Sequence, residues 1–309
     1  MGADWLKAYV AVTDGDWYRY LSRLPDLDEV NFWQPSPSGA FRAVQPGELF
    51  LFKLHHPENY IVGGGFFADY SVLPASLTWE SFGEKNGASS LEDMKLRIRK
   101  YRRSSDLTED PDVGCIVLVQ PFFFDRRDWI SAPLSFAKNI VRGKTYDFES
   151  LEGRALWRDL EARLLAVRQD EWQEVAALGA FAMVRRRLGQ GAFRVLVTDT
   201  YRRQCAISGE KVLPVLQAAH IQPVASGGLH RIENGLLLRS DIHTLFDRGY
   251  VTVTPRYEVR VSNRLKKDFA DGEYYGQFDG QGIWLPTAEQ ERPDAQLLEW
   301  HSDTVFRAS

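Results

Sequence analysis

Residues 212–247 carry the pattern that most restricts how this chain can fold. Val212 to His220 reads as a strand that ends in a histidine, and the proline and glycines after it indicate a loop. Asn234-Gly235 is a strong turn signal, and the three leucines at 236–238 can begin a second strand. The order of these signals predicts two strands joined by a loop.

A helix is expected directly after the second strand. Ser240 or Asp241 offers an N-cap, and the helix would run through His243 and the apolar pair Leu245-Phe246. Strand, loop, strand and helix together predict a ββα unit that is held by apolar packing. The residues expected in its core are Leu213, Val215, Leu236, Leu238, Leu245 and Phe246.

The charge of the chain is unevenly distributed. The segment from Arg185 to Lys267 contains 15 Lys and Arg against six Asp and Glu, a net charge of +9. Because the whole chain carries a formal charge of −4, the remainder carries −13. A basic module within an acidic chain is the electrostatic footprint of a segment that meets a polyanion. A solvated charged surface would have the same composition, so charge alone leaves both interpretations open.

Three of the six histidines, His220, His230 and His243, fall within 24 residues of one another. The segments around them are Cys205-Ala206-Ile207-Ser208-Gly209, Gln217-Ala218-Ala219-His220-Ile221-Gln222-Pro223, Asn234-Gly235-Leu236-Leu237-Leu238, and Asp241-Ile242-His243 followed by Leu245-Phe246-Asp247. This stretch resembles the HNH nuclease motif, in which a histidine, an asparagine and a histidine follow in that order. The wider region from about residue 180 to 309 resembles the HNH domain of predicted bacterial restriction endonucleases.

The resemblance implies a role for each member of the motif. His220 would be the general base that deprotonates a water molecule, since an unperturbed imidazole titrates near neutral pH. Asn234 would bridge the two strands through its side-chain amide and so keep His220 oriented. His243, on the helix, would be a metal ligand. The other histidines match no motif position and are expected to be exposed residues without a role: His55, His56, His230 and His301.

The metal site departs from the family pattern at one position. Many HNH nucleases place Asp or His directly before the base as a second metal ligand, whereas this chain has Ala219. Asp241 is a candidate ligand, although its offset favours a helix cap. A site with few protein ligands leaves positions for water and phosphate oxygens, which favours one Mg²⁺ or Mn²⁺ per active site. Cys205 is the only cysteine in this region, so no structural zinc is expected.

The first half of the chain predicts short strands and one capped helix. Gly and Pro punctuate apolar runs at 47–54, 60–67 and 114–120, which predict strands. A helix is expected at 91–101, capped by Ser89-Ser90, and a helical stripe at 149–178 predicts a linker helix. Gly63-Gly64-Gly65 lacks the spacing of a nucleotide-binding loop and predicts a close backbone approach within a strand.

Three segments in this half, Asn31-Phe32-Trp33-Gln34-Pro35, residues 46–52 and residues 61–67, resemble a PUA-superfamily barrel, of the EVE kind more than the SRA kind. The resemblance covers about residues 25–145 and implies a pocket that grips a modified base. A flipped base would be held by stacking on aromatic rings and by hydrogen bonds to its edge. The candidate residues are Trp33, Phe66, Phe67, Tyr70, Trp79 and Phe82, with Trp33, Phe66, Tyr70 and Trp79 named as the base site. Taken singly, each of them is better explained as a core residue, and the pocket is expected of the group.

Basic side chains are expected to contact the DNA backbone, which gives affinity without sequence information. Those in the nuclease region are Arg187, Arg194, Arg239 and Arg248. The helix from Leu91 to Arg103 is also basic and either follows the backbone or presents a solvated face.

Together these patterns predict an α+β protein of three parts: a PUA/EVE-like β-barrel with flanking helices at 1–148, a helical linker at 149–184 and a ββα-metal HNH domain at 185–309. We expect a cytoplasmic, phage-defence restriction endonuclease that recognises modified cytosine, 5-methyl or 5-hydroxymethyl, in double-stranded DNA. No membrane contact is expected, because no apolar run is long enough to span one. A homodimer that cuts both strands is a further expectation of the family.

Three other interpretations remain open at this stage. The chain could be a nicking or repair nuclease without preference for a modified base. It could be a DNA-binding regulator whose HNH fold is silent because Ala219 removes a ligand. A purely structural protein is the weakest alternative, since it leaves the motif and the basic segment unexplained.

Overall fold

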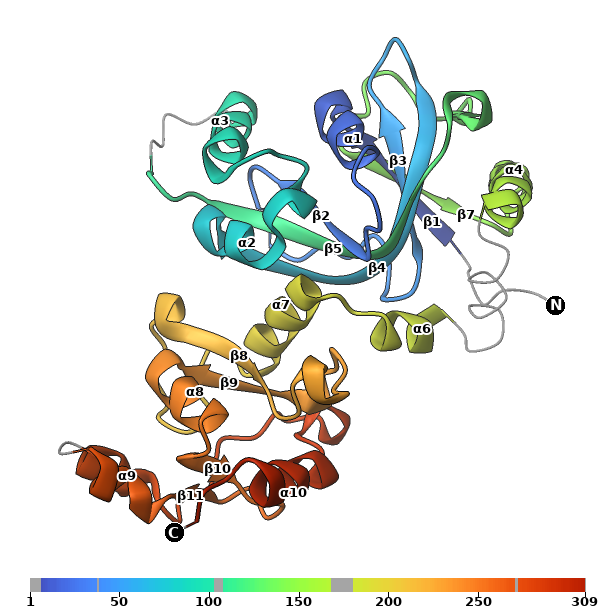
Figure 1. The fold of residues 1–309 in the computed structure, drawn as a ribbon. Coiled ribbons are helices and arrows are strands. Elements are labelled where there is room, and N and C mark those ends of the chain that lie inside the picture. Colours follow the sequence, from blue (N-terminus) through green and yellow to red (C-terminus); the bar gives the residue numbers. More distant parts are fainter. Residues whose placement is uncertain (1–6, 38, 103–107, 168–179, 270–271, 309) are drawn as a thin grey trace. The chain divides into compact units, whose positions relative to one another are not determined.

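The computed structural model describes residues 7–37, 39–102, 108–167, 180–269 and 272–308 (Figure 1). The chain forms two compact units: a first unit, Met1–Ala192, and a second unit, Phe193–Ser309. None of the described helices combines the length and the apolar character that crossing a membrane requires.

The first unit is built on a seven-stranded mixed sheet. Its strands are β1 (Lys7–Thr13), β2 (Glu29–Gln34), β3 (Leu49–Leu54), β4 (Tyr60–Pro74), β5 (Asp112–Phe123), β6 (Ile130–Ser131) and β7 (Gly143–Asp147). Their order is β2-β5-β4-β3-β1-β7, with β6 paired to β4. β1 is parallel to β3, and the other pairs are antiparallel. The helices of this unit are α1 (Gly15–Leu21), α2 (Ala75–Phe82), α3 (Leu91–Tyr101), α4 (Leu151–Val167) and α6 (Ala180–Arg186).

Both faces of this sheet are covered, as the alternation of residues along β5 shows. Ile116 and Leu118 belong to a buried cluster that includes Trp17 of α1. Cys115 points to the opposite face, where its thiol lies 3.4 Å from the hydroxyl of Thr78 on α2. The apolar run of β5 is therefore buried on both sides, as expected for a strand without polar alternation.

The sheet is open, and the closed barrel expected for this region is not found in the part of the chain that the structure describes. The path ends at β2 on one side and at β7 on the other. Next to β2, the Asn31 amide donates to the Asn86 side-chain oxygen (2.9 Å), and the Trp33 indole N–H donates to the Asn86 carbonyl (2.9 Å). These two bonds fix the segment after α2 to side chains of β2 on the face of the sheet that α2 covers.

The strands expected at 47–54, 60–67 and 114–120 are confirmed as β3, β4 and β5. The capped helix at 91–101 is confirmed as α3, with the Ser90 hydroxyl accepting from the Asp93 N–H. The helical stripe at 149–178 is confirmed as α4 up to Val167. Its remainder lies outside the described residues, as does Arg103 after α3.

The glycine run in β4 has the expected structural cause. A Cβ on Gly63 would lie 2.2 Å from the carbonyl oxygen of Phe122 in β5, and one on Gly64 would lie 2.7 Å from that of Phe50 in β3. Any side chain at these positions would force neighbouring strands apart. The close backbone approach predicted for the three glycines is therefore confirmed, and it brings β4 close to β3 and β5.

The second unit contains the predicted ββα unit. Its elements are α7 (Gln190–Thr200, which begins before the boundary of the unit), β8 (Leu216–His220), β9 (Gly235–Arg239), α8 (Ser240–Asp247), β10 (Val251–Val253), β11 (Val259–Val261), α9 (Asn263–Asp268) and α10 (Ala295–Thr304). β8 and β9 are antiparallel, and His220 at the end of β8 pairs with Gly235. α8 follows β9 directly, which confirms the predicted order of elements.

The predicted core of this unit is confirmed in most positions. Leu236, Leu238 and Phe246 are fully buried, and Leu213 and Leu245 pack against them. Val215 is wrong as a core strand residue, because it is only half-buried and belongs to a short 3-10 helix, Leu213–Val215. Pro214 favours this turn over an extended strand, so β8 begins only at Leu216.

Candidate active site

His220 is placed by β8 at the edge of the ββα unit. Its ring stacks on the buried Phe193 ring of α7, with a centroid distance of 3.9 Å and an angle of 12°. His220 itself is half-buried, so the stack fixes the plane of the imidazole and leaves part of it accessible.

His220 is neutral at physiological pH. Burial lowers its pKa to about 4, and the nearby His230 and His243 act in the same direction. A histidine with so low a pKa carries an available lone pair over the whole range from pH 5 to 8. This is the protonation state that a general base requires.

Asn234 locks the loop that follows His220. Its side chain is 1% exposed, and its Oδ1 accepts a hydrogen bond from the Gln222 N–H at 2.8 Å. Its Nδ2 donates to the carbonyl oxygens of Gln222 and Leu229, both at 2.9 Å. One buried amide thus satisfies three backbone groups of the loop between β8 and β9.

His243 and Asp247 lie one turn apart on α8. Nε2 of His243 is 3.3 Å from Oδ2 of Asp247, and Nδ1 of His243 is 2.8 Å from the Gln217 side-chain oxygen in β8. Burial lowers the pKa of His243, and the Asp247 carboxylate partly opposes that shift. If Nδ1 carries the proton and donates it to Gln217, Nε2 presents its lone pair on the side of Asp247.

Asp241 is held by a different set of partners. Both its oxygens accept from the Arg239 guanidinium at 2.7 Å, and the Tyr275 hydroxyl donates to it at 2.9 Å. The hydrogen bonds from Arg239 hold the pKa of Asp241 below its usual value. The N-cap of α8 is Arg239, without a side-chain cap, so the capping role expected for Ser240 or Asp241 is wrong.

The donors next to His243 fit a divalent cation with few protein ligands. Among the residues described, no three His, Cys, Asp or Glu side chains are grouped as metal ligands. The imidazole nitrogen of His243 and the carboxylate of Asp247 are close enough to share one ion. The carboxylate is a ligand that Mg²⁺ and Mn²⁺ prefer together with water, whereas an imidazole is more typical of ions such as Zn²⁺.

Residues 205–254 match the family model described as HNH endonuclease. This segment is an HNH endonuclease domain. The match includes His220, Asn234 and His243, so the sequence motif lies within it. The matched segment lies entirely within the second unit.

No curated protein sequence matches the chain. Among solved structures, a modification-dependent TagI restriction endonuclease is similar at 13% sequence identity, over 97% of this chain and 82% of that chain, with a TM-score of 0.29. A TM-score of this size does not establish a common fold.

Two histidines of the second unit, His230 and His301, were expected to be exposed but are not. His230 is half-buried, and its Nδ1 is 3.0 Å from Nε2 of His220. His301 in α10 is 2% exposed and stacks on Phe246 at 3.7 Å. The sequence predicted exposed side chains for both, because no repeating apolar pattern in the sequence indicates either contact. His55 and His56 are exposed, as predicted.

The arginines expected on the DNA backbone have different surroundings. Arg248 is exposed at the end of α8. Arg239 is committed to Asp241, while Arg194 is half-buried in α7. Arg187 lies in the first unit within hydrogen-bonding distance of the Gln120 amide. Arg248 is thus the one of these four whose exposure best suits a phosphate contact.

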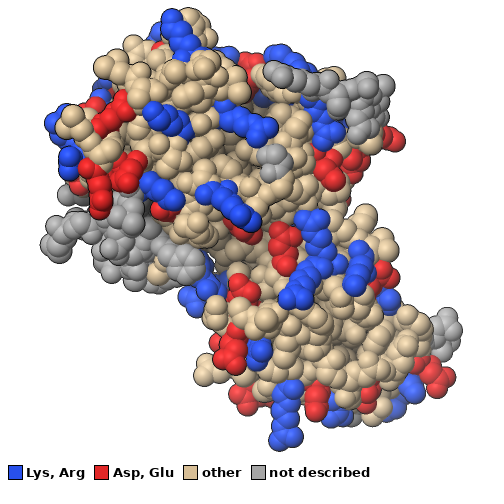
Figure 2. All heavy atoms as spheres, turned by 180° about the vertical axis from the view of Figure 1, so that it is seen from behind, with Lys and Arg blue, Asp and Glu red and all other residues tan. Residues whose placement is uncertain are grey.

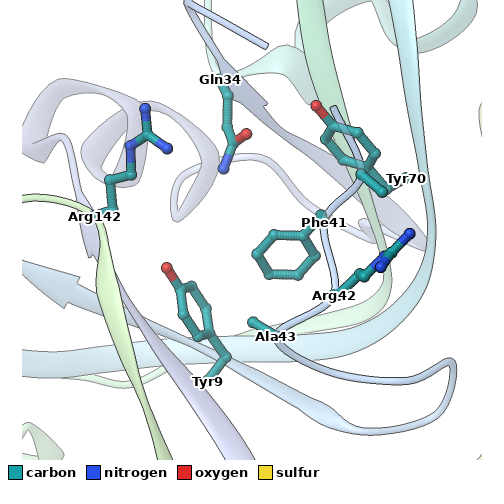
Figure 3. A pocket seen from close by; sticks show the side chains of 8 residues that line it. Tyr9, Gln34, Phe41, Arg42, Ala43, Tyr70 and Arg142 are labelled. Carbon is teal, nitrogen blue, oxygen red and sulfur yellow. The ribbon is translucent and has the colours of Figure 1, made fainter. Parts of the chain in front are cut away.

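The first unit contains a pocket of about 260 Å³. Figure 3 shows Tyr9 and Gln34 extending toward the same space, with Phe41 beside them and Arg142 at the edge. The Phe41 ring is 5.3 Å from the Tyr9 ring and 6.2 Å from the Tyr70 ring. The remaining lining residues are Ala40, Arg42 and Ala43.

One of the four aromatic residues named as the base site, Tyr70, lines this pocket. Phe66 is 3% exposed in the core of the sheet, and the Trp33 indole is bound to Asn86. Trp79 lies on α2, outside the pocket lining. Sequence reasoning missed Tyr9, Gln34, Phe41 and Arg142, because they come from separate segments that only the fold of the sheet brings together.

Proposed function

We propose that this protein is a modification-dependent restriction endonuclease, in which the HNH domain cuts DNA and the first unit binds a modified cytosine. The observation that carries the nuclease part is the neutral, stacked His220 beside the His243–Asp247 pair within an HNH endonuclease domain. Phage defence is the role that such an enzyme would serve.

In the proposed mechanism, His220 accepts a proton from a water molecule while the water oxygen attacks phosphorus. The bond from phosphorus to the leaving oxygen breaks, and that oxygen takes a proton from solvent water. Asn234 keeps the loop after β8 in place through its three hydrogen bonds, so that His220 meets the water in one orientation.

His243 and Asp247 are the residues that we propose as ligands of a divalent cation, Mg²⁺ or Mn²⁺. When bound, the cation offsets the charge that builds on the phosphate and the leaving oxygen. Gln217 would orient His243 by accepting a hydrogen bond from its Nδ1–H. A ligand role for Asp241 would require its two-point pair with Arg239 to break.

We propose the pocket of the first unit as the site of the flipped base. Its volume of about 260 Å³ is sufficient for one base, and Tyr9, Phe41 and Tyr70 offer aromatic faces. The half-buried Gln34 side-chain amide makes no hydrogen bond with any residue that the structure describes, so its donors and acceptor can face a base edge. Arg42 and Arg142 would contact the flanking phosphates.

The surface charges favour contact with DNA at a few separate basic side chains. They do not form one broad basic face on the side shown in Figure 2. Figure 2 shows Lys and Arg side chains interspersed with Asp and Glu on the face in view. We propose Arg248 as a backbone contact of the HNH domain. Cutting of both DNA strands would need two copies of the single HNH site, and we therefore propose a homodimer on DNA.

The test is a cleavage assay with Mg²⁺ or Mn²⁺ on matched duplexes that carry unmodified, 5-methyl- or 5-hydroxymethylcytosine. We expect cutting of a modified duplex alone and its loss in His220→Ala. Equal cutting of all duplexes would refute the reader and keep the nuclease. Binding without any cutting would instead favour the silent DNA-binding regulator.

The ligand set is tested separately with Asp247→Asn and the matched variant Asp241→Asn. Mn²⁺ affinity, measured by calorimetry without DNA, should fall by about 10- to 100-fold in Asp247→Asn and stay near wild type in Asp241→Asn. The reverse pattern would assign the carboxylate ligand to Asp241.

A further inference from the structure

His230 is brought to His220 by the loop that joins β8 and β9. Its Nδ1 lies 3.0 Å from Nε2 of His220, and the two ring centroids are 5.0 Å apart at an angle of 59°. His230 also lies beside the Phe193 ring, with a centroid distance of 5.8 Å. The catalytic imidazole is thus bounded by an aromatic face and by a second imidazole.

The loop is built to hold His230 in that position. Asn234 donates to the carbonyl of Leu229, the residue directly before His230. Gly228 is buried, and a Cβ there would lie 1.8 Å from the carbonyl oxygen of Gln222. Only glycine permits this approach, so the return of the loop toward His220 depends on residue 228 as well as on Asn234.

We propose that His230 is a positioning residue that fixes the tautomer of His220. Its Nδ1 accepts a hydrogen bond from the Nε2–H of His220, which leaves the lone pair of His220 on Nδ1 for the proton of the attacking water. The inference rests on the proposed role of His220 as general base.

The direction of this hydrogen bond follows from counting protons. Only one proton can lie between the two facing ring nitrogens, and either ring can supply it. If His230 were the donor, Nε2 of His220 would be occupied as an acceptor and its Nδ1 would carry the other proton, so no lone pair would remain for water. His220 Nδ1 makes no hydrogen bond with any residue that the structure describes, which leaves this atom to the substrate side.

An imidazole partner differs from the carboxylate that often serves this role. A carboxylate would raise the pKa of the base, whereas His230 and His243, the titratable neighbours that act on His220, both lower it. His230 therefore orients His220 and at the same time helps to keep its pKa low, so that the base is unprotonated before the reaction.

The experiment compares His230→Asn with His230→Leu in the full-length protein. The Asn side-chain oxygen can stand where His230 Nδ1 stands and keeps an acceptor, whereas Leu removes it. Single-turnover cleavage with Mg²⁺ should be about 10- to 100-fold slower in His230→Leu, with DNA affinity unchanged and the rate largely retained in His230→Asn.

A second readout is independent of cleavage. Nitrogen NMR of histidine-labelled protein should show His220 as the Nε2–H tautomer in the wild type and in His230→Asn, and as a mixture in His230→Leu. A wild-type rate in His230→Leu, or an Nδ1–H tautomer in the wild type, would overturn the proposal. If His230→Leu does not fold, the wild-type tautomer and the His230→Asn rate decide. A wild-type protein that cuts no duplex refutes the proposed function instead, and the tautomer still tests the contact.

Discussion

The active site of the second unit and the pocket of the first are assembled in different ways. Every side chain of the active site except Phe193 comes from residues 217–247, a single strand, loop, strand and helix. The pocket collects Tyr9 from β1, Gln34 from β2, Phe41 from a loop, Tyr70 from β4 and Arg142 from the segment before β7. A site of the first kind can be recognised from local sequence, and a site of the second kind exists only once a sheet has formed.

The largest expected effect separates the two sites by function. His220→Ala should reduce cleavage by about 10³-fold, the usual contribution of a general base, and leave binding to modified DNA unchanged. The measurement is single-turnover cleavage beside a binding titration on the same duplex. His55→Ala, a change at an exposed histidine, is the control and should behave as wild type. Parallel loss of binding would show that the two sites are not separable.

The second prediction tests how much the side-chain amide of Asn234 contributes to the stability of the active-site loop. Asn234→Ala removes three hydrogen bonds and leaves buried backbone groups without partners, so the free energy of unfolding should fall by about 3 kcal/mol. Urea denaturation measures it. Asn263→Ala, at an exposed asparagine of the same unit, should change stability by less than about 0.5 kcal/mol. Equal effects would mean that solvent replaces the bonds of Asn234.

A third prediction concerns His301, a residue of the second unit that is positioned by distant segments. Its Nδ1 lies 2.8 Å from the Thr252 hydroxyl, its Nε2 lies 3.2 Å from the Phe246 carbonyl, and burial lowers its pKa to about 4. The unfolded chain binds the proton first as pH falls below about 6.5, so stability declines between that pH and about 4.

Between pH 7.5 and 5, His301 should remove about 2 kcal/mol from the free energy of unfolding. The measurement is urea denaturation at both pH values for the wild type and for His301→Gln, which does not titrate. His220, whose pKa is also about 4, contributes to both proteins and cancels in the difference. An identical pH dependence in both proteins would show that His301 is protonated at little cost.

The smallest expected effect addresses the dispersed pocket. Gln34→Ala should lower the preference for the modified over the unmodified duplex by about 10-fold, because it removes the amide that would face the base edge. Competition binding measures it, with Gln45→Ala, an exposed glutamine of the same unit, as the control. An unchanged preference would place the base elsewhere, for instance near Trp33 or Trp79.

The sequence predicted the locally built active site better than the dispersed pocket. His220 at a strand end, Asn234 at the turn and His243 on the helix were predictable because their order and spacing are local. Asp247, one helical turn after His243, was visible in the motif but became a ligand candidate only through its 3.3 Å separation from Nε2. His230 had no periodic signal, and the folded-back loop around Gly228 is what brings it to the base.

In the first unit, the strands could be predicted from apolar runs and glycines, but their closure could not. Whether a sheet closes depends on whether its two end strands pair with each other, and here the strand order ends at β2 and at β7. The aromatic residues were also ambiguous, because a buried Phe66 and a pocket-lining Tyr70 have the same appearance in sequence. Composition identified the aromatic set, and only the fold separates core from pocket.

The pairing of His243 with Asp247 on one turn has a thermodynamic consequence. Asp247 is the last residue of α8, a helix of eight residues, and the ends of short helices fray. An ion that binds only when both donors are one turn apart also binds only the intact helix. By mass action, raising the concentration of that ion stabilises the fold itself, so the melting temperature of the nuclease part becomes a measure of site occupancy.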